Sequence, residues 1–131
     1  MTLAPFLAAS AAIQVHVVAA LGAFALGAVQ MLSPKGTPVH RRLGRVWVAV
    51  MVLGAASSFL IHELRMWGAW SPIHLLSVIT LVGLWRGWLA ARRGDGLIHA
   101  RIMALLFVFA LIGAGVFALL PGRLLHQVVF G

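Results

Sequence analysis

Residues 5–32 read PFLAASAAIQVHVVAALGAFALGAVQML and contain no Asp, Glu, Lys or Arg. A bilayer core about 30 Å thick needs about 20 apolar helical residues to cross it. The stretch is therefore long enough for one membrane-spanning helix. Three further runs have the same character, so the predicted spans are residues 5–32, 44–62, 73–91 and 99–120.

The composition of the whole chain agrees with these spans. Of its 131 residues, 63% are hydrophobic and 9% are charged, and the mean hydropathy is +1.06. A soluble domain is about half apolar and about a quarter charged, so this chain has too little polar surface for a soluble fold. Cysteine is absent, which excludes disulfides and thiolate chemistry. We predict an all-α integral membrane protein, with residues 1–131 forming one domain.

The connections between the predicted spans are short and contain helix-breaking residues. Residues 33–38 separate the first two spans, residues 70–72 precede the third, and residues 93–96 precede the fourth. Short connections join antiparallel neighbours, so we predict an up-down-up-down four-helix transmembrane bundle. In such a bundle the first and third spans face each other diagonally, as do the second and fourth.

The net charge of +8 is concentrated in two connections. One holds Lys35, Arg41, Arg42 and Arg45, and the other holds Arg92, Arg93 and Arg101. By the positive-inside rule, both basic connections face the cytoplasm and both termini lie outside. The clusters form no basic stripe on a polar fold, so nucleic acid is not an expected partner.

Six histidines in a chain with two acidic residues are the unusual feature of the sequence. His16 lies near the middle of the first span and His74 at the outer start of the third, while His40 and His99 lie at the cytoplasmic starts of the second and fourth. An ionisable group within a membrane often marks a functional site. The alternative for His16 is a neutral imidazole bonded to a carbonyl or serine of a neighbouring helix. For His40 and His99 the alternative is a place among the lipid head groups.

Taken in pairs, these histidines suggest a cofactor. A b-type haem needs two axial imidazoles from facing helices and apolar side chains around its ring. His16 and His74 lie on one diagonal in the outer half, and His40 and His99 lie on the other diagonal at the inner edge. We therefore expect one or two haems b, with the first pair holding an outer haem and the second pair an inner haem.

Other polar residues extend or compete with this assignment. Four arginines could neutralise haem propionates: Arg41, Arg45, Arg42 and Arg101. Anchoring by the positive-inside rule explains the positions of these arginines equally well. His62 and Glu63, with His74, offer nitrogen and oxygen ligands of the kind that zinc accepts. No fixed ligand spacing supports that zinc site.

Four motifs carry a resemblance to a known family: HRRLGRVW (40–47), SPIHLLS (71–77), HARIM (99–103) and LPGRL (120–124). With them, the chain resembles the small bacterial membrane proteins grouped as domain of unknown function 2306, from about His16 onward. The resemblance implies a four-helix bundle in the bacterial inner membrane and emphasises His40, His74 and His99. The chain is also similar to the transmembrane di-haem cytochromes b. That similarity implies an outer haem between the first and third helices and an inner haem between the second and fourth.

The leading hypothesis is a b-type haem membrane protein that carries electrons across or along the membrane, with quinone or a redox protein as partner. No enzyme motif is present. If the chain is an enzyme, the haem hypothesis makes a membrane oxidoreductase the expected class. A second hypothesis is a histidine-lined metal or proton permeation protein, because imidazoles change charge near neutral pH. A third is a structural or assembly subunit without its own activity. Lipid surrounds the chain in each case, and a homo-oligomer is compatible with all three.

Overall fold

The computed structural model describes residues 2–60, 72–121 and 123–130. These residues are helical, with no strand among them. The elements are α1 (Ala4–Leu7), α2 (Ala11–Leu32), α3 (Pro38–Ser58), α4 (Pro72–Arg92), α5 (Gly96–Leu105), the π-helical segment η1 (Leu106–Gly113), α6 (Ala114–Ala118) and α7 (Leu124–Phe130). The predicted all-helical class is confirmed for the part of the chain described.

The first predicted span is divided into two helices. Its long helix, α2, begins at Ala11 rather than at residue 5, because Ser10 caps it by accepting a hydrogen bond from the backbone N–H of Ile13. The preceding residues form α1, and the side chain of Gln14 donates to two carbonyls at the end of that short helix. Apolar character alone did not reveal this break.

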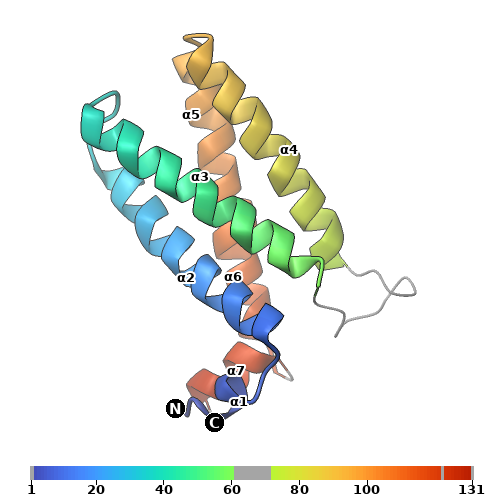
Figure 1. Cartoon of the computed structure of the whole chain (residues 1–131). Coiled ribbons are helices and arrows are strands. Elements are labelled where there is room, and N and C mark those ends of the chain that lie inside the picture. The colour runs from blue at the N-terminus through green and yellow to red at the C-terminus, as the bar shows by residue number, and fades with distance from the viewer. Residues whose placement is uncertain (1, 61–71, 122, 131) are drawn as a thin grey trace.

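The two basic connections are tight turns that lie at one end of the molecule (Figure 1). Gly36 and Gly94 have φ angles of 77° and 80°, a left-handed conformation that glycine adopts without steric cost. After the first turn, Thr37 caps α3 by accepting a hydrogen bond from the backbone N–H of His40 at 3.0 Å. The positive charges of both connections are thereby gathered at the same end.

Three of the described helices are long and apolar enough to cross a membrane: Ala11–Leu32, His74–Arg92 and Gly96–Val116. The fourth long helix, α3, carries Arg41, Arg42 and Arg45 in its first two turns, which lowers its apolar character. Many large apolar side chains on these helices are exposed, such as Val18 at 62%. Such a surface suits contact with lipid rather than water.

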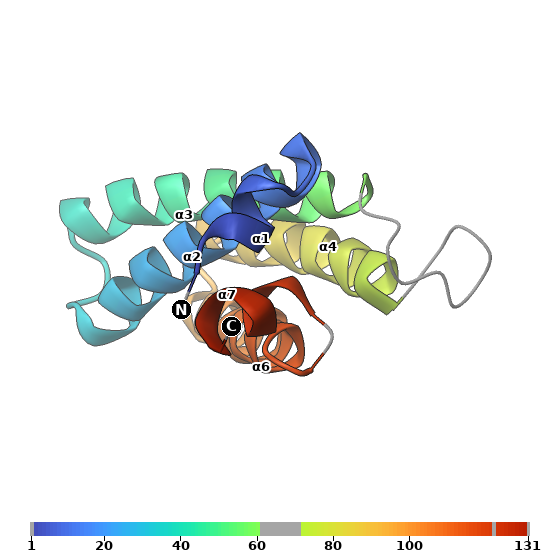
Figure 2. The same ribbon diagram turned by 90° about the horizontal axis from the view of Figure 1, so that it is seen from below.

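The long helices pack in a definite order. α2 packs on α3 and η1, while α4 packs on α3, α5 and η1, so α2 and α4 lie on opposite sides of α3 and η1. α5, η1 and α6 follow one another without a break. At the other end from the basic connections, α1 contacts α7 and both termini lie close by (Figures 1 and 2).

The core lies between α2, α3, α4 and η1. Its buried residues are Ala23, Trp47, Met51, Leu84 and Leu106. The α2 face of this core is made of small residues, Ala19, Ala23 and Gly27, all of them buried. Small side chains let membrane helices approach closely, and a Cβ atom at Gly27 would lie only 2.6 Å from the ring of Phe107.

Candidate functional site

His16 lies in the second turn of α2, where its ring faces α3. Nδ1 lies 2.7 Å from the carbonyl oxygen of Gly54 and 3.3 Å from the hydroxyl of Ser57. A carbonyl oxygen only accepts, so Nδ1 carries the hydrogen and donates it. The other nitrogen, Nε2, then carries the lone pair of a neutral imidazole. The structure thus shows the carbonyl and serine partners that formed the alternative for His16.

His74 lies in the first turn of α4 and is 2% exposed. Its ring stacks on that of Phe59 at the end of α3, with ring centroids 5.9 Å apart. His16 therefore contacts Gly54 and Ser57, and His74 contacts Phe59, all within the last turns of α3. The structure brings both imidazoles of the predicted outer pair against the same segment of α3.

Three serines lie on the same parts of α3 and α4 as these histidine contacts, and one of them, Ser57, contacts His16. Ser58 is fully buried, and its hydroxyl donates to the carbonyl of Ala55 at 2.6 Å. The hydroxyl of Ser77, on α4, forms a hydrogen bond with that of Ser58. Either hydroxyl can be the donor in this pair. We call His16, Ser57, Ser58, His74 and Ser77 the serine cluster; it links α2, α3 and α4.

The second pair of predicted residues lies at the end with the basic connections. The Nδ1 atom of His99 donates to the carbonyl of Gly87 on α4 at 2.9 Å. His40 is the third residue of α3, and the side chain of Gln30 donates to its backbone carbonyl at 2.9 Å. Nδ1 of His40 and Oε1 of Gln30 are buried and have no hydrogen bond within the part of the chain described. We call Gln30, His40 and His99 the loop cluster.

The two histidines of the loop cluster are close enough to affect each other electrostatically. His40 lies in the first turn of α3, before the predicted second span. Burial lowers the pKa of His40 below its ordinary value, and the charges of Lys35 and His99 lower this pKa further. The neutral form of His40, which has a lone pair available for a metal, is therefore favoured near neutral pH.

An apolar layer separates the serine cluster from the loop cluster. Along α3, His40 precedes Ser57 by 17 residues, which corresponds to about 25 Å of helix. The core residues lie between them, and the indole nitrogen of Trp47 donates to the carbonyl of Ala23 at 3.0 Å. The two clusters are thus distinct sites at opposite ends of the helices.

The predicted arginines do not converge on the histidines. Arg41 and Arg45 are exposed on the first turns of α3, and Arg101 lines a groove between α4 and α5. Their assignment to haem propionates stays a prediction. His62 and Glu63, the suggested zinc ligands, lie outside the described residues.

Two findings bear on whether a histidine contact identifies a metal ligand. Within the described ranges, no group of three or more His, Cys, Asp or Glu side chains could hold a metal ion, whereas a haem iron needs only two axial ligands. His126, on α7, also uses Nδ1, which donates to the carbonyl of Leu119 at 2.9 Å. A bond from Nδ1 to a carbonyl is therefore not sufficient evidence for a ligand, and the packing of each ring matters.

Sequence reasoning missed the serines and Gln30. A usable signal was present in α4, where His74, Ser77 and Thr80 recur every third residue and are all buried. Such spacing places side chains on one helix face. An interior face that begins with three polar residues points to a polar site, whereas Gln30 stands alone in an apolar run and gave no such pattern.

The fold and its apolar helices define a helical membrane protein. The chain belongs to the family described as "Predicted membrane protein (DUF2306)", whose model matches residues 13–129. The resemblance seen in the sequence motifs is thereby confirmed. No curated protein and no solved structure matches the chain, so the similarity to di-haem cytochromes b stays a hypothesis.

Proposed function

We propose that this protein is a b-type haem membrane protein that moves electrons across or along the bilayer, with quinone or a redox protein as partner. In this proposal the part of α3 that follows His40 is also a membrane span, the second along the chain. The basic connections face the cytoplasm of the inner membrane, and both termini lie outside. His16 and His74 would hold one haem, and His40 and His99 a second.

The observation that carries the proposal is the grouping of the imidazoles. Helices α2 and α4 each bring one histidine to the end of α3, although these two helices lie on opposite sides of α3 and η1. At the other end, His40 lies in the first turn of α3 and His99 in the first turn of α5, next to the basic connections. Two imidazoles from opposite helices are the protein ligands that a b-type haem requires.

The hydrogen bonds of the rings also fit iron ligation. Histidines that bind a metal usually donate their second ring N–H to a carbonyl, which fixes the ring and makes the other nitrogen more basic. Nδ1 of His16 and of His99 does this with Gly54 and Gly87. Bound haem would supply one-electron oxidation and reduction, and the imidazoles of the chain would hold it.

The apolar layer favours electron transfer over permeation. Met51, Leu84 and Leu106 pack with Trp47 between the two clusters. A proton or metal ion needs polar groups along its whole path, because a charge in an apolar medium is strongly disfavoured. An electron passes between cofactors through apolar protein. The third hypothesis, an assembly subunit, remains an outcome of the test below.

The test is an absorption spectrum of protein purified from haem-supplied cells, with haem per chain quantified. We expect His16→Ala and His74→Ala each to remove the same haem, so that the double variant loses no more than either single variant. His40→Ala and His99→Ala should remove the other haem in the same way. His126→Ala is the matched control, because His126 has the same Nδ1 contact but lies on α7.

Several results would overturn the proposal. Wild-type protein that stays colourless after addition of haemin would exclude haem binding. If such protein supports histidine-dependent proton flux in liposomes, permeation replaces the proposal, and a stable partner in pull-down without flux would indicate an assembly subunit. Equal haem loss in His126→Ala would refute the assignment of the four ligands.

A further inference from the structure

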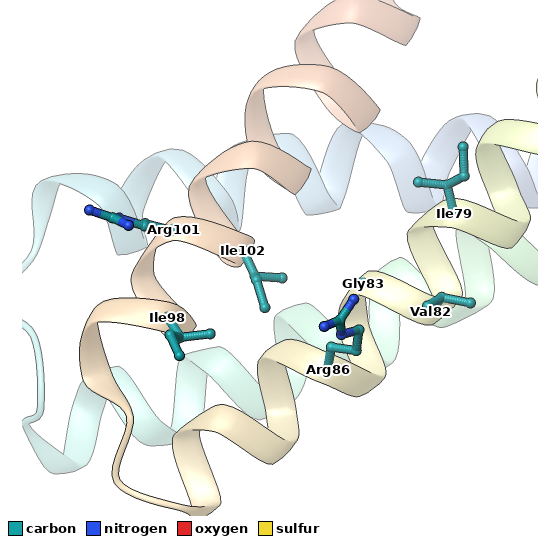
Figure 3. Close-up of a pocket in the computed structure, with 7 residues that line it drawn as sticks. All are labelled: Ile79, Val82, Gly83, Arg86, Ile98, Arg101 and Ile102. Atoms are coloured by element: carbon teal, nitrogen blue, oxygen red, sulfur yellow. The ribbon is translucent and has the colours of Figure 1, made fainter.

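A groove of about 460 Å³ lies between α4 and α5, and no histidine is among the residues that line it (Figure 3). On α4 it is lined by Ile79, Val82, Gly83 and Arg86. The spacing of these residues places them along one face of the helix. Most of this wall is apolar, and Arg86 stands at the end closer to the basic connection of α4 and α5.

The opposite wall comes from the first turns of α5. Ile98 and Ile102 are directed toward the space between the helices, whereas Arg101 extends from the rim of the groove and points away from α4 and Arg86 (Figure 3). Both helices are candidate membrane spans, and Val82 and Ile98 are at least half exposed. The groove therefore opens where a lipid would lie.

The two arginines give this apolar groove a strong positive charge. Within the described residues, neither Arg86 nor Arg101 has a hydrogen bond or an ion pair. The whole sequence contains two acidic residues, Glu63 and Asp95, so the chain has few anions to offer. A charged guanidinium near hydrocarbon is costly unless it reaches a head group or an anionic partner.

Both arginines lie at the same depth. Arg86 precedes the end of α4 by about 9 Å, and Arg101 follows the start of α5 by about 7.5 Å, from the rise of a helix. Trp85, beside Arg86, is 64% exposed, and tryptophan favours the head-group level of a bilayer. Ile79 lies two turns deeper than Arg86, where acyl chains would pass.

We propose that this groove binds one anionic phospholipid from the leaflet next to the basic connections. Its phosphate lies beside Arg86, since a guanidinium group binds phosphate through charge-assisted hydrogen bonds, and Arg101 adds positive charge at the rim. One acyl chain runs along Val82 and Ile79. The site needs neither histidine cluster, so it stands or falls independently of haem binding.

Simple anchoring predicts a different result from a built site. If the arginines only set topology, every arginine near this leaflet attracts anionic lipid to a similar extent. A built site instead depends on the two groove arginines and on the acyl chains. The comparison therefore needs a control that removes the same charge from the neighbouring turn, and Arg92 and Arg93 provide it.

Delipidated wild-type protein in detergent is titrated with phosphatidylglycerol or phosphatidylcholine, and bound lipid is counted by native mass spectrometry. We expect phosphatidylglycerol to bind at least about tenfold more tightly, because both lipids carry the phosphate but the choline cation of phosphatidylcholine is repelled by the arginines. Arg86→Gln with Arg101→Gln should bring the two lipids within about threefold of each other. Arg92→Gln with Arg93→Gln should leave the preference within about threefold of wild type.

Equal binding of the two lipids by wild type would overturn the proposal. So would equal losses in the groove and control variants, or glycerol phosphate binding as tightly as the intact lipid. If the groove variant does not fold, wild type still gives a result through Trp85. Phosphatidylglycerol with brominated acyl chains should quench the fluorescence of Trp85 at lower concentrations than brominated phosphatidylcholine. The Trp85 signal is identified as the part of the fluorescence that Trp85→Phe lacks. Equal quenching by the two lipids would refute the site.

Discussion

The indole nitrogen of Trp47 donates a hydrogen bond to the backbone carbonyl of Ala23 across the interface of α2 and α3, over 3.0 Å. Both residues are buried in the core. Without water in the surroundings, a polar N–H of this kind needs a partner inside the protein. The bond therefore fixes how the two helices face each other between the two histidine clusters.

Trp47→Phe keeps most of the ring and removes this bond. We expect a loss of about 1 kcal/mol in the free energy of unfolding, the usual net value of one hydrogen bond. Trp47→Ala should cost more, about 3–5 kcal/mol, because it also leaves a cavity. Unfolding in detergent micelles measures both, with the exposed Trp85→Phe as the control; a cost for Trp85→Phe as large as for Trp47→Phe would contradict the assignment.

Gly27→Ala should destabilise the protein by about 1–3 kcal/mol, the usual cost of overpacking. The new Cβ atom would lie 2.6 Å from the ring of Phe107 and 3.0 Å from the indole nitrogen of Trp47. Gly22→Ala, in the same helix, meets only Val50 at 3.9 Å and should be neutral or slightly stabilising. Melting temperatures in one detergent compare the two, and equal stability would show that α2 and η1 do not pack this closely.

Ser58→Ala and Ser77→Ala should be coupled by about 1 kcal/mol in a double-mutant cycle, as expected for residues in direct contact. Their hydroxyls share a buried hydrogen bond between α3 and α4. Ser58→Ala removes the hydroxyl that bonds to Ser77, and the carbonyl of Ala55 loses its donor. Chemical denaturation of the two single variants and the double variant gives the coupling; strict additivity would mean that this bond does not form.

The stability of the protein should fall as the pH is lowered below the ordinary histidine pKa of 6.5, partly because of His40. Burial, Lys35 and His99 lower the pKa of His40 in the folded state, so the unfolded chain binds protons first. Folding therefore weakens as the pH falls through the range between the two pKa values. His40→Gln should flatten this part of a plot of melting temperature against pH, and His126→Gln should not. Parallel curves for wild type and His40→Gln would refute the effect.

Much of the fold could be predicted from the sequence because lipid imposes simple rules. A long apolar run without charges has few alternatives to a helix, and three of the four predicted spans appear as long apolar helices. The turns at Gly36 and Gly94 fall inside the predicted connections. The separate helix α1 was missed because Ser10 caps α2 within a run that is otherwise apolar.

The site was only partly predictable. The sequence gives the residue types, and counting residues along each span gives the depth of each histidine in the membrane. His16 and His74 were paired in this way. Which neighbour a ring contacts depends on helix rotation, and an apolar sequence gives little indication of rotation. The hydrogen bond of His16 to Gly54 and the contact of Ser58 with Ser77 needed the packed helices to become visible.

The π-helical segment Leu106–Gly113 sets the angular position of everything that follows it. Each residue of an α-helix advances about 100° around the axis, whereas wider turns advance less. Gain or loss of one residue in this segment would rotate α6 about the helix axis relative to α5. The contact between α1 and α7 would then move as well. The alignment of the two ends of the chain is thus controlled from the middle of the last long helix.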